Sequence, residues 1–189
     1  MDPKTLSAYL AFLKNAGQLK DTLRSAHTTE GRQESTAEHT WRLCLWVLVF
    51  KGEFPELDVE KLLKISVLHD LGEAISGDIP AVDQDPKLSK SDDERRDLET
   101  LLSPLPAERQ REFLDLWDEY ENASSPEAKM IKGLDKLETI MQHNQGANPP
   151  DFDYEFNLTY GEKHTSSHPL LRAIREFLDE STAARANED

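Results

Sequence analysis

Cysteine, basic residues and long apolar runs are all scarce in this sequence. The 189 residues include one cysteine, Cys44, so no disulfide bond can form within the chain. The longest uninterrupted apolar run, residues 43–50, is much shorter than the roughly 20 residues that a membrane-spanning helix needs. We therefore expect no membrane partner. The first residues show no basic segment followed by an apolar one, so we expect no signal peptide. The single cysteine makes a cytoplasmic location the simplest expectation.

The shortage of basic residues makes the chain strongly acidic. Lys and Arg number 22 against 37 Asp and Glu, which gives a formal net charge of −15. A molecule with this charge repels other polyanions, so we expect no binding to a nucleic acid polymer. The length fits one domain, which we place at residues 1–180 and follow with a polar C-terminal tail at residues 181–189.

Glycine and proline are few, and they cluster between segments whose apolar residues recur at helical spacing. Ser35 and Glu38 form a capping-box pattern at the start of one helix, and Asp58 and Ser125 are predicted caps of two others. No segment alternates clearly enough to predict a strand, and residues 18–33 are typical of a polar connection. The sequence therefore predicts an all-α fold, with helices over residues 6–16, 36–51, 59–71, 92–102, 107–122, 126–145 and 169–180.

His69 and Asp70 stand at the end of an apolar helix, where an ionised carboxylate needs a cation or several hydrogen-bond donors. His39, near the start of another apolar helix, and Asp135, within the helix predicted at 126–145, occupy comparable places. These helices would bring two imidazoles and two carboxylates to one point. Such a set suits a divalent ion such as Mn, Co, Fe, Ni or Zn. The alternative for each histidine is a core residue satisfied by its neighbours.

The order and surroundings of these residues resemble those of the HD-domain metal-dependent phosphohydrolases. Within these, the chain is similar to the 5'-deoxynucleotidase branch, which contains the YfbR and HDDC2-like proteins. The resemblance covers about residues 5–180. It is carried by the motifs RQESTAEHTW at 32–41, LHDLGE at 68–73, GDIP at 77–80 and LDKLE at 134–138.

The resemblance implies a single helical bundle with one divalent ion, Co, Mn, Zn, Ni, Fe or Mg, between its central helices. It also implies a homodimer and a phosphohydrolase that releases phosphate from (deoxy)nucleoside 5'-monophosphates by means of a metal-activated water. The implied metal ligands are His39, His69, Asp70 and Asp135. Glu73, together with Asp70, is the implied catalytic carboxylate, with a solvated loop acid as the alternative for Glu73. Asp78 is the implied sugar contact, with a turn residue as its alternative.

The family also places a phosphate-binding arginine 15 residues before the first histidine, and this chain has Arg24 at that position. A planar guanidinium matches a terminal phosphate with two parallel hydrogen bonds. Well-known bacterial members have a tryptophan after this arginine, whereas this chain has Ser25. Lys136, next to Asp135, is a second candidate phosphate contact, with a surface lysine as the alternative.

Residues 71–134 contain no histidine, although two-metal phosphodiesterases of the superfamily supply extra histidines there, so we expect a single ion. We assign no role to His143, His164 or His168. The alternative functions are hydrolysis of another small phosphoester or of a nucleoside triphosphate, and a non-catalytic module that binds a nucleotide or metal. The apolar residues that we consider for self-association, with internal packing as their alternative, are Phe113, Leu116 and Trp117.

Overall fold

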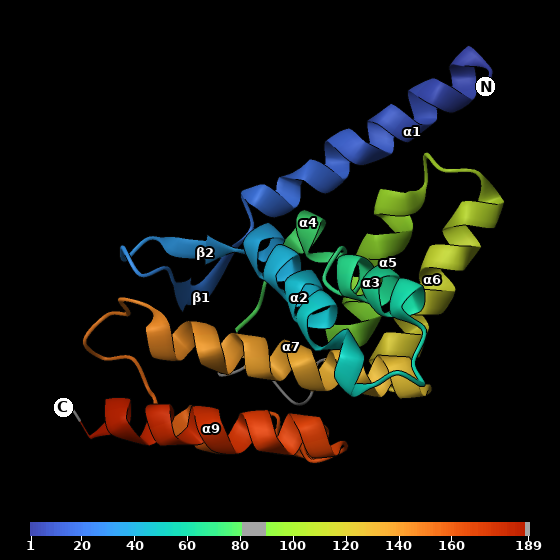
Figure 1. Ribbon diagram of the computed structural model, residues 1–189. Coiled ribbons are helices and arrows are strands. Elements are labelled where there is room, and N and C mark those ends of the chain that lie inside the picture. Colours follow the sequence, from blue (N-terminus) through green and yellow to red (C-terminus); the bar gives the residue numbers. More distant parts are fainter. Residues whose placement is uncertain (81–89, 188–189) are drawn as a thin grey trace.

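The computed structural model describes residues 1–80 and 90–187, and it shows a bundle of helices with one short β-hairpin (Figure 1). This confirms the predicted all-α class. No helix in the described part of the chain is long and apolar enough to cross a membrane. The helices are α1 (Pro3–Ala16), α2 (Thr36–Phe50), α3 (Val59–Leu68), α4 (Glu73–Ser76), α5 (Lys90–Leu102), α6 (Ala107–Glu121), α7 (Pro126–Gln145), α8 (Glu162–Thr165) and α9 (Pro169–Ala186). The strands are β1 (Leu23–His27) and β2 (Gln33–Ser35), and the 3-10 helices are η1 (Gly17–Lys20), η2 (Lys51–Glu53) and η4 (Glu155–Leu158).

The three helices that carry the candidate ligands begin at the predicted caps. Ser35 Oγ accepts a hydrogen bond from the amide of Glu38 at 3.3 Å, and Glu38 Oε2 accepts one from the amide of Ser35 at 2.9 Å. Asp58 accepts hydrogen bonds from amides in the first turn of α3, and Ser125 accepts one in the first turn of α7. The starts of α2, α3 and α7 are therefore fixed by local sequence.

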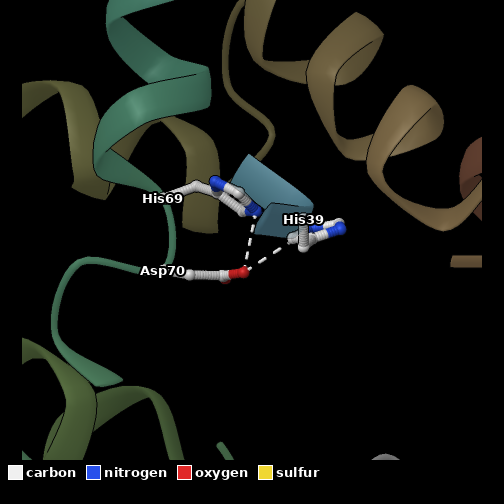
Figure 2. A group of neighbouring side chains, drawn as sticks. All are labelled: His39, His69 and Asp70. Carbon is white, nitrogen blue, oxygen red and sulfur yellow. Dashed lines mark ion pairs between the residues drawn. The ribbon is translucent and has the colours of Figure 1, made fainter. Parts of the chain in front are cut away.

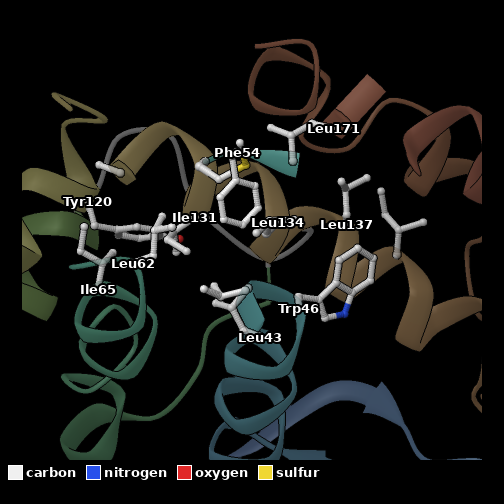
Figure 3. Close-up of a cluster of buried hydrophobic side chains, with 14 of the residues drawn as sticks. Leu43, Trp46, Phe54, Leu62, Ile65, Tyr120, Ile131, Leu134, Leu137 and Leu171 are labelled. Atoms are coloured by element: carbon white, nitrogen blue, oxygen red, sulfur yellow. The ribbon is translucent and has the colours of Figure 1, made fainter. Parts of the chain in front are cut away.

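The main hydrophobic core lies where α2, α3, α7 and α9 meet (Figure 3). Helix α7 runs between α9 on one side and α2 and α3 on the other (Figure 1). Gly133 allows α9 to approach closely, because a Cβ at this position would lie 2.3 Å from Leu171 Cδ1. The side chains in this core that are almost fully excluded from solvent include Leu43, Phe54, Leu62, Ile65, Ile131, Leu134, Leu137, Ile140 and Leu171.

A second cluster of buried apolar side chains joins α4, α5 and α6, and it corrects the proposed self-association residues. Trp117 is buried in this cluster, and its indole Nε1–H donates a hydrogen bond to the carbonyl oxygen of His69 at 3.0 Å. Phe113 and Leu116 are half-buried and also pack inside the bundle. Because these three side chains pack inside the bundle, they do not form a surface for self-association.

The β-hairpin corrects the prediction that residues 18–33 form a plain polar connection. Strands β1 and β2 are antiparallel, with His27 opposite Gln33. The two strands have 5 and 3 residues, which is too short for an alternating pattern to stand out in the sequence. The hairpin is anchored on α7, since Gln142 Nε2 donates a hydrogen bond to the carbonyl oxygen of His27. This contact holds the end of β1 against the C-terminal part of α7.

Several helix ends differ from the prediction. Helix α3 ends at Leu68, and the short helix α4 lies between the helices predicted at 59–71 and 92–102. Residues 81–89 lie outside the described residues. Helix α9 continues to Ala186, and Thr182 is buried and donates a hydrogen bond to Asn144 Oδ1 at 3.1 Å. The division into a domain and a tail at residue 180 stays a prediction.

The helical stripe predicted for the N-terminal helix faces solvent. Leu6, Leu10 and Leu13 of α1 are 48%, 57% and 62% exposed, and α1 projects from the bundle in Figure 1. Trp41 lies in the apolar helix α2, and it is 63% exposed. Helical periodicity identified these apolar faces, but it does not show whether another element of the chain covers them.

Candidate metal centre and active site

Two chain segments bring His39, His69 and Asp70 together (Figure 2). His39 lies in the first turns of α2, whereas His69 and Asp70 directly follow the end of α3. The ligand atoms of the three side chains all lie within 4.8 Å of one another. Asp70 Oδ2 is 3.0 Å from His69 Nε2 and 3.6 Å from His39 Nε2. The predicted convergence of these two segments is therefore present.

Asp135 reaches the same point from a third segment, α7. Its Oδ1 lies 3.1 Å from His39 Nε2 and 3.9 Å from His69 Nε2. Its Oδ2 accepts a hydrogen bond from the Tyr120 hydroxyl at 2.8 Å and lies 2.9 Å from Lys136 Nζ. One carboxylate oxygen is thus held by partners, while the other faces the two imidazoles.

Both imidazoles are oriented with Nε2 toward these carboxylates. His69 Nδ1–H donates to the carbonyl oxygen of Ser66 at 2.8 Å, and His39 Nδ1 pairs with Glu138 Oε2. A neutral imidazole has one N–H, so each Nε2 is left with a lone pair. Both Nε2 atoms are buried without a hydrogen-bond partner in the described part of the chain. Two such lone pairs beside two carboxylates match the donor set of a divalent metal ion.

The electrostatics of this group also favour a cation. Burial lowers the pKa of His39, but the carboxylates of Glu138 and Asp135 raise it to about 10. Burial raises the pKa of Asp70, but the facing imidazoles of His69 and His39 bring it below its usual range. The acids therefore stay ionised, and at neutral pH either a proton on His39 or a metal ion must balance them.

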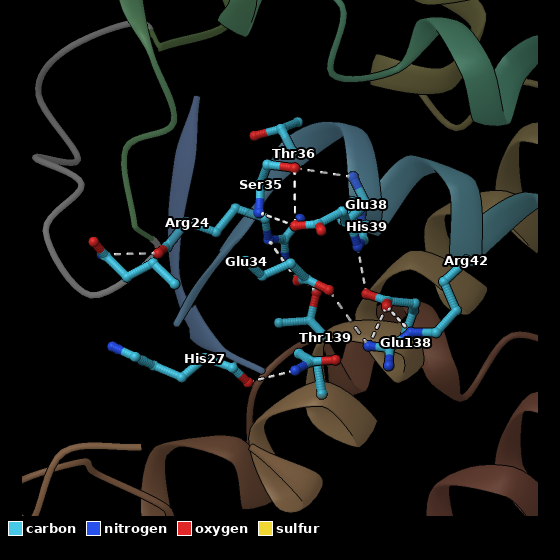
Figure 4. A network of polar contacts seen from close by, with 12 residues as sticks. Arg24, His27, Glu34, Ser35, Thr36, Glu38, His39, Arg42, Glu138 and Thr139 are labelled. Atoms are coloured by element: carbon cyan, nitrogen blue, oxygen red, sulfur yellow. Dashed lines mark hydrogen bonds and ion pairs between the residues drawn. The ribbon is translucent and has the colours of Figure 1, made fainter. Parts of the chain in front are cut away.

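Glu138 connects His39 to a buried chain of alternating charges (Figure 4). Glu138 is fully buried, and its Oε1 lies 2.5 Å from Arg42 Nη2. Arg42 Nη2 lies 3.7 Å from Glu34 Oε1, and Arg24 Nε lies 3.6 Å from Glu34 Oε2. The chain of charges thus runs from the candidate ligand His39 to the candidate phosphate-binding residue Arg24.

Arg24 extends from β1 toward the candidate ligands. Its Nη2 donates a hydrogen bond to Thr139 Oγ1 at 2.9 Å, and its Nη1 lies 3.9 Å from Asp70 Oδ2. Burial lowers the pKa of Arg24, but the carboxylates of Glu138 and Asp70 raise it above its usual value. The guanidinium is therefore a permanent positive charge beside Asp70.

Lys136 points into the site rather than to the surface. Besides Asp135, its Nζ lies over the Tyr160 ring, 5.3 Å from the ring centroid. Burial lowers the pKa of Lys136, but Asp135 raises it above its usual value. Gly161 lets the chain pass over this lysine: its φ is +68°, and a Cβ there would lie 2.7 Å from Lys136 Cβ.

A cavity of 650 Å³ opens over these residues, and Arg24, Glu73 and Asp78 help to line it. Glu73 begins α4 and is 5% exposed, so it is not a solvated loop acid. Thr36 Oγ1 donates a hydrogen bond to Glu73 Oε2 at 3.1 Å, which fixes the carboxylate. Asp78 is half-buried at the same cavity. The volume is in the usual range of small-molecule sites.

The structure therefore brings the predicted site residues to this cavity or to its buried floor, while their chemical roles stay predictions. Sequence reasoning missed the contacts of Glu138, Thr139 and Tyr120. Glu138 and Thr139 follow Asp135 by three and four residues, so they share its helix face, and this spacing was a readable signal. Arg32 lies on the surface, where it forms an ion pair with Glu38 at 2.7 Å.

The sequence and fold also match known proteins. The profile of the HD domain family matches residues 16–175. The 5'-deoxynucleotidase HDDC2 of Bos taurus is 36% identical over 138 residues, which cover 72% of this chain and 66% of the bovine protein. The 5'-deoxynucleotidase HDDC2 of Mus musculus is 30% identical over 187 residues, with 94% of this chain and 90% of the mouse protein covered.

Solved structures of other proteins have the same fold as this chain. A predicted metal-dependent phosphohydrolase from Magnetospirillum magnetotacticum superposes with a TM-score of 0.83 at 23% identity, covering 96% of this chain and 94% of that one. A conserved hypothetical protein from Pyrococcus furiosus is 31% identical, with a TM-score of 0.62 and coverage of 91% and 98%. The chain therefore belongs to the HD-domain family and, within it, to the 5'-deoxynucleotidase HDDC2 proteins.

Proposed function

We propose that this protein is a metal-dependent phosphohydrolase that releases inorganic phosphate from (deoxy)nucleoside 5'-monophosphates. One observation carries the proposal: two buried imidazole nitrogens without hydrogen-bond partners in the described part of the chain face Asp70 and Asp135 beside a cavity with an arginine in its wall. The names of the HDDC2 relatives support the substrate class.

His39, His69, Asp70 and Asp135 are the proposed ligands of one divalent ion. The ion, whether Co, Mn, Zn, Ni, Fe or Mg, supplies an acidified water and offsets charge on the phosphoryl oxygens. Three of the four proposed ligands are oriented by hydrogen bonds, since Ser66 holds His69, Glu138 holds His39 and Tyr120 holds Asp135. Such preorganisation lowers the cost of assembling the site during the reaction.

The remaining steps use groups of the chain itself. Arg24 binds the terminal phosphate next to Asp70 and aligns it for in-line displacement of the sugar oxygen. Glu73, held by Thr36, takes the proton that the attacking water gives up and passes it to the departing sugar oxygen, so that a nucleoside and inorganic phosphate leave. Asp78 contacts the sugar, and Lys136 adds a second positive charge near the phosphate.

The charges of the cavity favour a monophosphate over a triphosphate. The cations at its floor, Arg24 and Lys136, lie beside the proposed ligands. Asp151 and Asp153, by contrast, are exposed acids that also line the cavity. A triphosphate would bring further negative charge toward these acids, so like-charge repulsion opposes it.

We also propose that the protein forms a homodimer through apolar faces on its surface. Trp41, Leu45 and Leu48 follow one another by four and three residues on α2, and they are 63%, 38% and 45% exposed. Leucines at the same spacing line the exposed face of α1. Unpaired apolar stripes of this kind are typical of interfaces. The cytoplasmic location inferred from the single cysteine is likewise a proposal.

The proposed reaction predicts that phosphate release depends on a divalent ion and on Glu73. Protein treated with a chelator will release no phosphate from dAMP or AMP, and adding back a divalent ion from a series will restore release. Glu73→Gln will lower kcat about 100- to 10,000-fold with little change in KM, since it removes proton transfer but not binding.

Glu121→Gln is the matched control, because Glu121 also lines the cavity but pairs with Lys132. A colorimetric phosphate assay with mono-, di- and triphosphates measures both points. Absence of release with every ion and substrate would leave only a non-catalytic binding module, and preferred release from triphosphates would overturn the substrate class.

Arg24 will affect substrate binding more than turnover. Arg24→Ala will raise KM for a nucleoside monophosphate about 10- to 100-fold, since hydrogen bonds between charged groups contribute about 1.5–3 kcal/mol. Arg32→Ala is the control, because Arg32 is a surface arginine paired with Glu38. Steady-state kinetics give both parameters, and an unchanged KM in Arg24→Ala would remove Arg24 from the phosphate role.

Glu138 will set metal affinity through His39. A glutamine at this position has one amide NH2 group, which must face either Arg42 or His39 Nδ1. If it faces His39 Nδ1, that nitrogen must accept a hydrogen bond, and the imidazole proton moves to Nε2. Glu138→Gln will therefore weaken divalent metal binding about 10- to 100-fold. Competition with a fluorescent chelator measures this without any turnover. Glu127→Gln at the start of α7 is the control, and equal affinities in the two variants would contradict the assignment.

The proposed dimer is tested by light scattering at micromolar protein concentration. The wild type will have twice the mass of one chain, and Trp41→Glu will shift the protein toward the monomer by placing a charge on the apolar stripe of α2. Phe177→Glu on α9 is the control, because Phe177 is 70% exposed on another helix. A monomeric wild type would disprove the dimer.

A further inference from the structure

One face of α7 spans the length of the cavity. Asp135, Thr139 and His143 follow one another by four residues on this helix, and all three line the cavity. At a rise of about 1.5 Å per residue, His143 lies about 12 Å along the helix axis from Asp135. The candidate metal ligand is therefore at one end of this face, the contact of Arg24 is in the middle, and His143 is at the other end.

Aromatic side chains line the cavity from its His143 end toward Lys136. The Phe152 ring packs edge-to-face on His143, with a centroid distance of 4.8 Å. Phe156 packs on Tyr160 at 5.3 Å, and Tyr160 in turn lies beside Lys136. All these rings line the cavity, and Phe152 and Phe156 are half-buried, so part of each ring faces the open space.

His143 presents a hydrogen-bond acceptor at the same end. Burial lowers the pKa of His143 to about 4, so its imidazole is neutral at physiological pH. Its Nδ1–H donates to Asn157 Oδ1 at 3.0 Å, and Asn157 is fully buried. Nε2 is therefore left as an acceptor. The nearby carboxylates of Asp151 and Asp153 line the cavity too and can only accept hydrogen bonds.

We propose that Phe152, Phe156 and His143 form the subsite for the nucleobase, with the base stacked on the phenyl rings and an amino group of the base donating to His143 Nε2. This inference rests on the proposed hydrolysis of nucleoside monophosphates. Asp135 and His143 are about 12 Å apart along α7, so a nucleotide whose phosphate lies beside Asp135 and Arg24 extends its base toward His143. Ser25, which lines the cavity beside Arg24, has no aromatic surface to offer the base there.

The subsite also predicts a preference among bases. Its polar groups are an imidazole acceptor and carboxylates, so it favours bases with an exocyclic amino group, as in dAMP and dCMP. Thymine presents two carbonyl oxygens on either side of its ring N–H, and these acceptors would face acceptors of the protein. We expect kcat/KM for dAMP and dCMP to exceed that for dTMP.

The experiment measures binding in the Glu73→Gln background, in which turnover is slow and substrate binding is retained. Calorimetric Kd values for dAMP are compared with those for inorganic phosphate, which occupies the metal end alone. Phe152→Ala and Phe156→Ala will each weaken dAMP binding about tenfold, because stacking on an aromatic ring is lost. The Kd for phosphate will not change.

Phe177→Ala is the matched control, since this exposed phenylalanine of α9 lies outside the cavity. Phe152→Leu, which keeps most of the packing on His143 but removes the aromatic face, guards against misfolding of the alanine variant. The subsite would be overturned if variants at both Phe152 and Phe156 bound dAMP with unchanged affinity. It would also be overturned if the parent protein bound dAMP and 2-deoxyribose 5-phosphate equally well. The readout is binding, so a protein that released no phosphate would refute the proposed reaction and leave this test intact.

Discussion

The structure depends on keeping several ionised groups together inside a helical bundle. Four carboxylates, those of Glu34, Asp70, Asp135 and Glu138, surround His39, and three of them are almost fully buried. An isolated buried carboxylate is too costly to remain charged, so each one must face a cation or hydrogen-bond donors. Two arginines, one lysine and a tyrosine hydroxyl provide these partners, and the lone pairs of the imidazoles leave room for one more positive charge. The metal-binding chemistry follows from this balance.

The β-hairpin supplies charged residues to the same buried group of ion pairs. It carries Arg24 on β1 and Glu34 on β2, and it leads directly into α2 with His39. The ion pairs from Arg24 through Glu34, Arg42 and Glu138 to His39 then tie the cavity wall to the ligand shell. A shift of the hairpin would move the proposed phosphate contact Arg24 and the proposed metal ligand His39 together. This coupling explains why a short irregular sheet is anchored on α7 in an otherwise helical protein.

Sequence reasoning located the long helices and the four candidate ligands because both depend on local signals. Caps such as Ser35 act within one turn, and a charged residue such as Asp135 stands out on an apolar helix face. Contacts between distant segments, such as Arg24 with Thr139 and Phe152 with His143, cannot be predicted from one sequence alone. The same limit applies to Trp41, because an apolar helix position is buried only if another element covers it.

The net charge of −15 is compatible with binding an anionic substrate because the charges are unevenly placed. Surface charges are screened over about 8 Å at physiological ionic strength, so groups within the cavity decide the final contact. There the cations Arg24 and Lys136 lie next to the ligand shell, whereas Asp151 and Asp153 lie beside the aromatic Phe152. A ligand with one charged end and one neutral, flat end matches this polarity in a single orientation. This charge distribution supports the proposed placement of a nucleotide, with its phosphate beside Arg24 and its base beside Phe152.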